Sequence, residues 1–201
     1  MNNIVSMVNE YILKRGVSYW PLTTEYLKKL CELEGYKVFS YSEGKEIIDT
    51  LGISEHCKQP AFLYKNKEFK FIFYTDSLMA SERNCRICHE LMHVILNQGT
   101  QKGSQPLDAK ALEEEAKIAS LQLLAPVCIV KHLGLKSVDE IEKRFQIPRE
   151  YAEHIYSKTI TYENLDIAEQ EIVNRFTHAF FQKVNHVGWK PTDPLPDTPL
   201  L

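Results

Sequence analysis

The chain has 201 residues, which is enough for one domain with a small appendage. Apolar residues make up 44% of the sequence and charged residues 25%, ordinary values for a globular protein. The net charge of −3 argues against a nucleic-acid partner or a charged membrane surface as partner. No segment approaches the roughly 18 apolar residues of a membrane span.

The first sixteen residues place apolar side chains at helical spacing between polar ones. They therefore predict an amphipathic helix and not an export signal. The five cysteines are an odd number and are widely spread along the chain. Because we expect no export signal, we predict a cytoplasmic location, where the reducing conditions keep thiols free.

In chain order, the pattern predicts helices on both sides of a small group of strands. Apolar residues at helical spacing, with capping residues, glycines or prolines at the ends, predict helices at about 3–15, 24–33, 43–51, 81–97, 108–124, 127–133, 137–146, 148–157 and 164–184. Residues 36–42 look like a strand, and the aromatic-rich runs 61–64 and 69–74 look like a hairpin. The second run has three phenylalanines on one face, which we expect to be core. The fold class predicted is α+β.

The stretch CRICHELMH, residues 85–93, holds two overlapping motifs. Its first five residues spell C-x-x-C-H, the signature of covalent haem attachment, and its last five spell H-E-x-x-H, the signature of zinc hydrolases. His89 belongs to both motifs and cannot serve both. Covalent haem is attached outside the cytoplasm and requires an export signal, so the zinc interpretation is favoured.

On a helix, His89 and His93 project from one face, because residues four apart differ by about 40° in direction. Two imidazoles in this arrangement can bind one zinc ion. Glu90 then lies within reach of a zinc-bound water, whose proton it would take as general base. The alternative is a solvated helix face that carries two unrelated histidines.

A catalytic zinc site needs a third protein ligand and an open position. The next predicted helix offers Glu113, Glu114 and Glu115 beside an apolar stripe whose small members, Ala116 and Ala119, allow a close approach to the first helix. Glu113 lies about 60° from the stripe, Glu115 about 100° and Glu114 about 160°. The geometry favours Glu113, with Glu115 as the next candidate. A run of acids is also common in a first helical turn, where the helix dipole favours negative charge.

These pieces together resemble the ImmA/IrrE-type metallopeptidases. Members carry H-E-x-G-H and then a helix that reads approximately E-x-E-A-x-x-F-A-x-x-L-L-x-P. This chain has E-x-E-A at residues 113–116 and L-L-x-P at residues 123–126, at matching spacing. The resemblance spans about residues 69–126 and continues weakly to about residue 157. The chain departs from the pattern at Met92, where the family has glycine.

The resemblance implies a zincin-like, gluzincin-type zinc metallopeptidase in which Glu113 completes the site of His89 and His93 and Glu90 is the catalytic residue. Members of the family are typically encoded beside helix-turn-helix repressors, which some of them cleave. A co-encoded repressor of this kind is therefore the implied protein substrate.

The predicted organisation has three parts. Residues 1–134 form the zincin-like domain with a small antiparallel sheet, residues 135–186 form a helical, helix-turn-helix-like extension packed on it, and residues 187–201, with four prolines, form a flexible tail. The stretch 137–157 contains five acidic and three basic residues. A packing or docking role is therefore favoured over direct binding of nucleic acid.

Other side chains near the motif have less specific interpretations. Cys85 and Cys88 could join the two histidines in a Cys2His2 zinc site, but the four directions span about 140° on one helix. We therefore expect buried or half-buried thiols. An oxyanion could be stabilised by one of several side chains, among which the pattern does not choose: His132, His154, Tyr64 or Tyr74.

Two functions fit the sequence. The first is a zinc endopeptidase that acts on a cytosolic regulatory protein, and the second is a non-proteolytic metal-binding protein that docks on a repressor or toxin. The presence of Glu90 favours the first, because docking does not require a general base.

Overall fold

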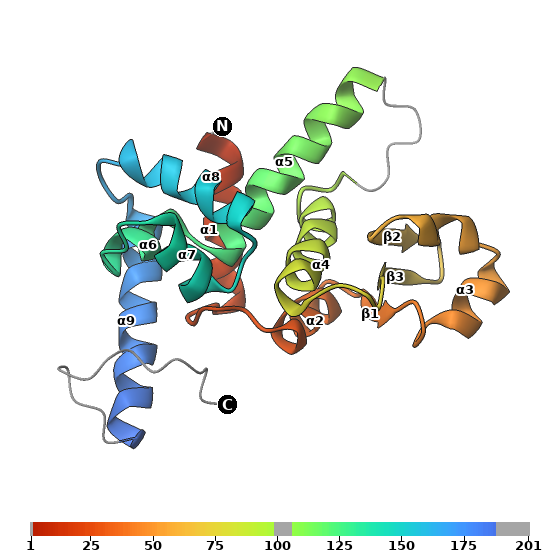
Figure 1. Cartoon of the computed structure of the whole chain (residues 1–201), viewed down its shortest axis with the longest axis horizontal. Helices are drawn as coiled ribbons and strands as arrows, with labels where there is room; N and C mark the ends of the chain where they lie inside the picture. The colour runs from red at the N-terminus through yellow and green to blue at the C-terminus, as the bar shows by residue number, and fades with distance from the viewer. Residues whose placement is uncertain (1, 99–105, 188–201) are drawn as a thin grey trace.

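The structure is a computed structural model that describes residues 2–98 and 106–187 (Figure 1). Its elements, in chain order, are α1 (Asn2–Arg15), α2 (Thr24–Leu33), β1 (Lys37–Ser40), α3 (Lys45–Leu51), the 3-10 helix η1 (Ser54–Lys58), β2 (Ala61–Lys65), β3 (Lys70–Tyr74), α4 (Ala80–Ile95), α5 (Pro106–Leu124), α6 (Val127–His132), α7 (Val138–Phe145), α8 (Arg149–Ile160) and α9 (Ile167–Val187). The predicted α+β class is confirmed. The tail predicted at 187–201 lies, apart from Val187, outside the described residues.

The three strands form one sheet in the order β1-β3-β2. The predicted hairpin is present, with β2 antiparallel to β3 and Phe62 opposite Phe73. The sheet was predicted to be antiparallel. This is wrong for one of its two strand pairs, because β1 pairs with β3 in parallel, with Val38 opposite Ile72. The chain passes from β1 through α3 and η1 to the far edge and returns through the hairpin, so β1 and β3 run in the same direction. Strand patterns alone do not reveal this crossover.

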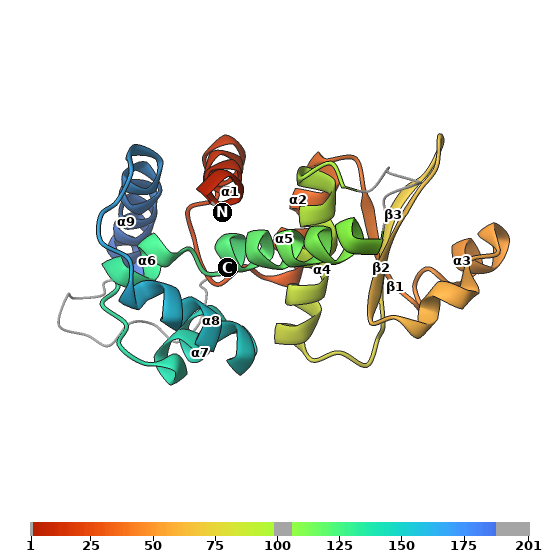
Figure 2. The same ribbon diagram turned by 90° about the horizontal axis from the view of Figure 1, so that it is seen from above.

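Helices cover both faces of the sheet (Figure 2). On one face, Phe62 and Phe73 pack with Ile48 of α3 in a small apolar cluster. On the other face, Ile72 and Tyr74 belong to the main hydrophobic core, which α2 and α4 share. A strand that is buried on both sides explains why β3 reads as a continuous apolar run after Lys70.

The phenylalanine stripe that was expected to be core is core only in part. Phe71 and Phe73 are buried, but Phe69 is 43% exposed. Phe69 precedes β3 and belongs to the hairpin turn, where its backbone N–H donates to the side-chain oxygen of Asn66 at 2.6 Å. The hydrogen bond of the turn therefore fixes Phe69 outside the core.

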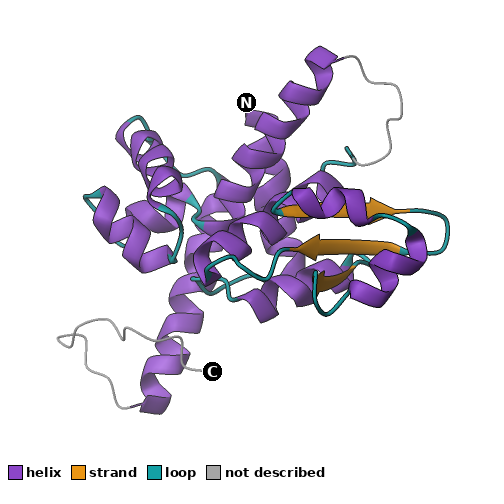
Figure 3. Cartoon of the chain, turned by 45° about the vertical axis from the view of Figure 1, so that its right-hand side comes forward, coloured by secondary structure: helices purple, strands orange, loops and turns teal. Residues whose placement is uncertain are grey.

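Helix α5 packs against both α4 and α1 (Figures 1 and 2). The strands gather at one end of a molecule that is otherwise helical (Figure 3). Ala116 and Ala119 are fully buried, and the Cys88 thiol of α4 donates to the backbone carbonyl of Ser120 at 3.6 Å. The predicted close approach of the two helices through small side chains is confirmed. The far end of α5 is held by Trp20, whose indole N–H donates to the carbonyl of Leu123 at 2.8 Å.

The helices after α5 share the main hydrophobic core with α1 and α4. Ile141 of α7, Ile155 of α8 and Phe176 of α9 belong to the same cluster as Leu91 of α4. Ser137 caps α7, since its hydroxyl accepts a hydrogen bond from the backbone N–H of Glu140 at 3.2 Å. The division into domains at residue 134 stays a prediction. None of the helices in the described part of the chain is long and apolar enough to cross a membrane.

Candidate metal centre

Helix α4 carries the H-E-x-x-H motif on its partly open face. It begins at Ala80, one residue before the predicted range 81–97, and the backbone N–H of Met79 donates to the Glu82 carboxylate at 3.4 Å. The opposite face of the helix is buried in the core through residues that include Leu91 and Met92. Burial of that face fixes the rotation of the helix, so the two motif histidines point toward α5.

His89, His93 and Glu113 converge at one point between α4 and α5. The Nε2 atoms of His89 and His93 lie 3.1 Å apart. Glu113 places Oε2 at 3.1 Å from Nε2 of His89 and Oε1 at 3.4 Å from Nε2 of His93. These three residues form a group that could hold a metal ion, with donor atoms within 4.8 Å of one another.

The donor atoms fit a tetrahedral zinc site. Zinc binds histidine nitrogen and carboxylate oxygen at about 2.0–2.2 Å, so neighbouring tetrahedral ligand atoms are separated by roughly 3.3–3.5 Å. The observed separations of 3.1, 3.1 and 3.4 Å lie close to that value. The side chain of Glu113 is 64% exposed while the histidines are largely covered. Three ligands with one open side match the arrangement of catalytic zinc sites.

Two polar side chains, Gln98 and Glu115, orient His93 through hydrogen bonds. Its Nδ1 lies 3.0 Å from Oε1 of Gln98, and the amide nitrogen of Gln98 donates to Glu115 at 2.8 Å. Glu115, the next candidate ligand, is therefore occupied by Gln98 and is not a member of the donor group. Gln98 was not predicted from sequence, because it lies beyond the helix that carries the motif and has no motif spacing.

Glu90, on α4, lies beside Leu63 of the edge strand β2. Burial, and then the negative charge of Glu113, raise the pKa of Glu90 to about 7, and a hydrogen bond from the backbone of Leu63 opposes this shift. Burial and the neighbouring His93 lower the pKa of His89, which favours its neutral, metal-binding form. The site thus combines a His89 imidazole whose neutral form is favoured with a carboxylate, Glu90, that is not among the three donors.

The cysteines of the overlapping C-x-x-C-H motif lie apart from the donor group. Cys85 and Cys88 are both buried in the main core, as expected, and all five cysteines of the chain are free thiols. Neither contributes to a group of potential metal ligands among residues 2–98 and 106–187. Both cysteines therefore belong to the face of α4 that packs in the hydrophobic core.

The four candidates for oxyanion stabilisation lie in different surroundings. Nε2 of His132 faces the Thr177 hydroxyl at 3.1 Å, and His154 lines a separate cavity. The hydroxyl of Tyr64 accepts from the Asn66 amide at 3.1 Å, and Tyr74, the last residue of β3, is buried in the main hydrophobic core. Neither His132 nor His154 belongs to the group of three donor residues.

Tyr41 is a neighbour of the site that the sequence did not indicate. Its hydroxyl donates to the carbonyl of Gln59 at 2.5 Å. Burial raises the pKa of Tyr41 to about 12, and the charges of Cys57 and Glu90 add to the shift. Because Tyr41 precedes the motif by 48 residues, no local spacing could have connected it with Glu90.

A mixed α+β fold with a His, His, Glu donor group between two helices defines a metallopeptidase-type protein. A family described as Peptidase_M78, the IrrE N-terminal-like domain, matches residues 31–157, which is more than half of the chain. The chain therefore belongs to the Peptidase_M78 (IrrE N-terminal-like) family, and the resemblance seen in the sequence is confirmed. Searches of curated proteins and of solved structures found no significant match.

Proposed function

We propose that this chain is a zinc-dependent endopeptidase that cleaves a cytoplasmic regulatory protein. The observation that carries the proposal is the convergence of His89, His93 and Glu113 beside a separate carboxylate, Glu90. A binding protein would need the three donors but would have no use for a base next to them. The free, largely buried cysteines suit a reducing compartment.

Each residue has a distinct role in the proposed reaction. His89, His93 and Glu113 would hold zinc, which when bound supplies the Lewis acidity that makes a water nucleophilic near neutral pH. Glu90 would accept the proton of the attacking water and pass it to the leaving nitrogen of the peptide. The exposed side of the site, where Glu113 is open to solvent, would admit the substrate.

A co-encoded helix-turn-helix repressor is the proposed substrate. The support for it is the family resemblance, since members are typically encoded beside such repressors. The proposed zinc identity has separate support from the donor set, since two imidazoles and one carboxylate suit zinc better than magnesium or calcium, which prefer all-oxygen sites.

Glu90→Gln tests the proposal most directly. The amide is nearly isosteric and Glu90 is not among the three donors, so folding and zinc content should be unchanged. Loss of the base should slow cleavage of the repressor by at least about 100-fold. Glu114→Gln is the matched control, because Glu114 is exposed on α5 and should leave cleavage unchanged.

Two results would contradict the proposed mechanism. If Glu90→Gln cuts the repressor as fast as the unmodified protein, Glu90 is not the base. If both proteins bind the repressor equally and neither cuts it, the non-proteolytic docking function is favoured instead. Zinc content measured on each sample separates these outcomes from simple loss of metal.

A further inference from the structure

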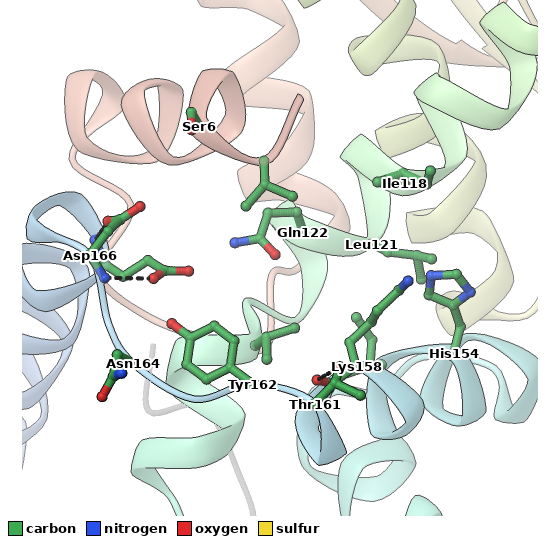
Figure 4. A pocket seen from close by; sticks show the side chains of 14 residues that line it. Ser6, Ile118, Leu121, Gln122, His154, Lys158, Thr161, Tyr162, Asn164 and Asp166 are labelled. Atoms are coloured by element: carbon green, nitrogen blue, oxygen red, sulfur yellow. Dashed lines mark hydrogen bonds between the residues drawn. The ribbon is translucent and has the colours of Figure 1, made fainter. Parts of the chain in front are cut away.

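A cavity of about 410 Å³ lies between α1, α5, α8 and the segment that leads into α9 (Figure 4). Its volume falls in the range of small-molecule sites. None of the residues that line it belongs to the donor group of His89, His93 and Glu113. The cavity is therefore distinct from the metal centre.

The walls of the cavity have three chemical parts. Apolar side chains of α5, α6 and α8 form much of the lining, among them Leu121, Val127 and Ile155. Lys158 and His154, both from α8, lie on one side of the cavity. Asp166, which directly precedes α9, and the hydroxyl of Tyr162 lie on the other side (Figure 4). Glu169, in the first turn of α9, also lines the cavity. Opposite charges therefore face each other across an apolar interior.

The acidic side contains a buried carboxylate that has no cation. Glu169 is only 6% exposed, and its Oε2 accepts a hydrogen bond from the backbone N–H of Asp166 at 2.9 Å. Among residues 2–98 and 106–187, no lysine, arginine or histidine forms an ion pair with it. Burying a carboxylate without a positive partner is costly, so the site is suited to receive one.

Tyr162 adds a second polar group beside Glu169. Its hydroxyl is buried and lies close enough to the Glu169 carboxylate to interact with it. Burial, and then the adjacent Glu169, raise the pKa of this hydroxyl above its usual range, so it remains protonated. Lys158, on the opposite side, likewise forms no ion pair within the described part of the chain.

We infer that this cavity binds a small apolar zwitterion, an apolar amino acid or a dipeptide. Its ammonium group would pair with Glu169 and contact Tyr162, its carboxylate would pair with Lys158, and its side chains would occupy the apolar interior. Each charged end would thus meet a complementary group that has no ion-pair partner among the residues that the structure describes. The inference does not depend on the proposed peptidase activity.

Calorimetric titration of the full chain with L-leucine and with L-leucyl-L-leucine tests this directly. We expect one molecule of at least one of the two to bind per chain, and the pair of probes distinguishes an amino acid from a dipeptide. The N-acetylated and C-amidated forms of the binding probe each lose one charge and should bind at least about 10-fold more weakly. Binding should persist after zinc is removed with a chelator, since the metal centre is separate.

Variants locate the binding on the molecule. Glu169→Gln and Lys158→Met should each weaken binding at least about 10-fold. Their matched controls, Glu163→Gln and Lys45→Met, change exposed residues that do not line the cavity and should bind normally. Glu169 also accepts a hydrogen bond from the backbone of Asp166, directly before α9, so its replacement could disturb the start of that helix. A third variant, Ile118→Trp, therefore fills the cavity without changing its charge and should abolish binding.

Three results would overturn the inference. The first is the absence of binding heat for either probe at millimolar concentration. The second is equal binding of the charged and capped probes. The third is loss of binding on chelation of zinc together with normal binding by Ile118→Trp, which would place the peptide at the metal centre.

Discussion

His93 and Gln98 are joined at 3.0 Å through the imidazole Nδ1 and the side-chain oxygen Oε1. An amide oxygen can only accept, so Nδ1 carries a proton, and in the neutral imidazole, the form that binds a metal, Nε2 keeps its lone pair. The orientation of the amide is itself fixed, because its nitrogen donates to Glu115 at 2.8 Å. Glu115 thus acts through Gln98 to turn the unprotonated nitrogen of His93 toward His89 and Glu113.

Gln98→Ala should therefore weaken zinc binding although Gln98 is not a ligand. Loss of the side chain that hydrogen-bonds to a metal-binding histidine typically reduces metal affinity by about 10–100-fold, and we expect at least about 10-fold here. Titration against a competing chelator measures the effect. Gln170→Ala, which removes an exposed glutamine of α9, is the control and should bind zinc normally. Equal zinc affinity in the two variants would show that Gln98 does not orient His93.

Glu113→Ala should weaken zinc retention far more than Glu114→Ala. Glu113 places its two oxygens at 3.1 and 3.4 Å from the histidine nitrogens, whereas Glu114 is exposed to solvent. Elemental analysis after dialysis against a weak chelator measures the difference. If both variants retain zinc equally, Glu113 is not the third ligand and Glu115 becomes the candidate.

Local patterns were sufficient to predict most helices and the relation between α4 and α5. The spacing of His89 and His93 and the small side chains at Ala116 and Ala119 are properties of single helices, and helix geometry converts them directly into positions in space. The choice of Glu113 over Glu115 followed from the same geometry. These predictions needed no knowledge of how distant segments pack.

Features that depend on the path of the chain could not be predicted in this way. The parallel pairing of β1 with β3 follows from a crossover through α3, and no strand pattern encodes it. Gln98 reaches His93 only because the chain turns after α4, where Asn97 adopts a positive φ of 55°. The lack of a cationic partner for Glu169 among the described residues likewise depends on how α1, α5, α8 and α9 are assembled around it.

The five cysteines should differ sharply in reactivity. Cys31, Cys85, Cys88 and Cys128 are buried, and burial raises the pKa of Cys31, Cys85 and Cys128 to about 12. Thiolate is the reactive form, so these thiols should be inert in the folded protein. Only Cys57 is partly exposed. A thiol reagent should therefore label about one cysteine in the native chain and all five after unfolding.

Replacement of Cys57 identifies the labelled thiol. Cys57→Ser should remove native labelling almost completely, while Cys88→Ala should leave it at about one thiol. Rapid native labelling of two or more cysteines would contradict the packing of α4 against α5, where the Cys88 thiol donates to the carbonyl of Ser120.

The helix pair α7–α8 should not give the protein strong affinity for DNA. Arg149, at the beginning of α8, is engaged by three carboxylates, with Asp139 at 2.6 Å, Glu153 at 3.4 Å and Glu142 at 3.6 Å. Arg144 is partly buried, and burial lowers its pKa. Since neutralisation of phosphates supplies most non-specific affinity, this surface has few free charges to contribute.

We therefore expect a dissociation constant for a duplex oligonucleotide weaker than about 10⁻⁴ M at physiological salt, the weak end of the non-specific range. Fluorescence anisotropy at two salt concentrations measures it. Asp139→Asn combined with Glu142→Gln removes two of the three acids around Arg149 and should strengthen binding, more so at low salt, because the guanidinium is then available to phosphate. Tight, salt-sensitive binding by the unmodified protein would instead show that α7–α8 is a nucleic-acid interface, and the docking role assigned to it would be wrong.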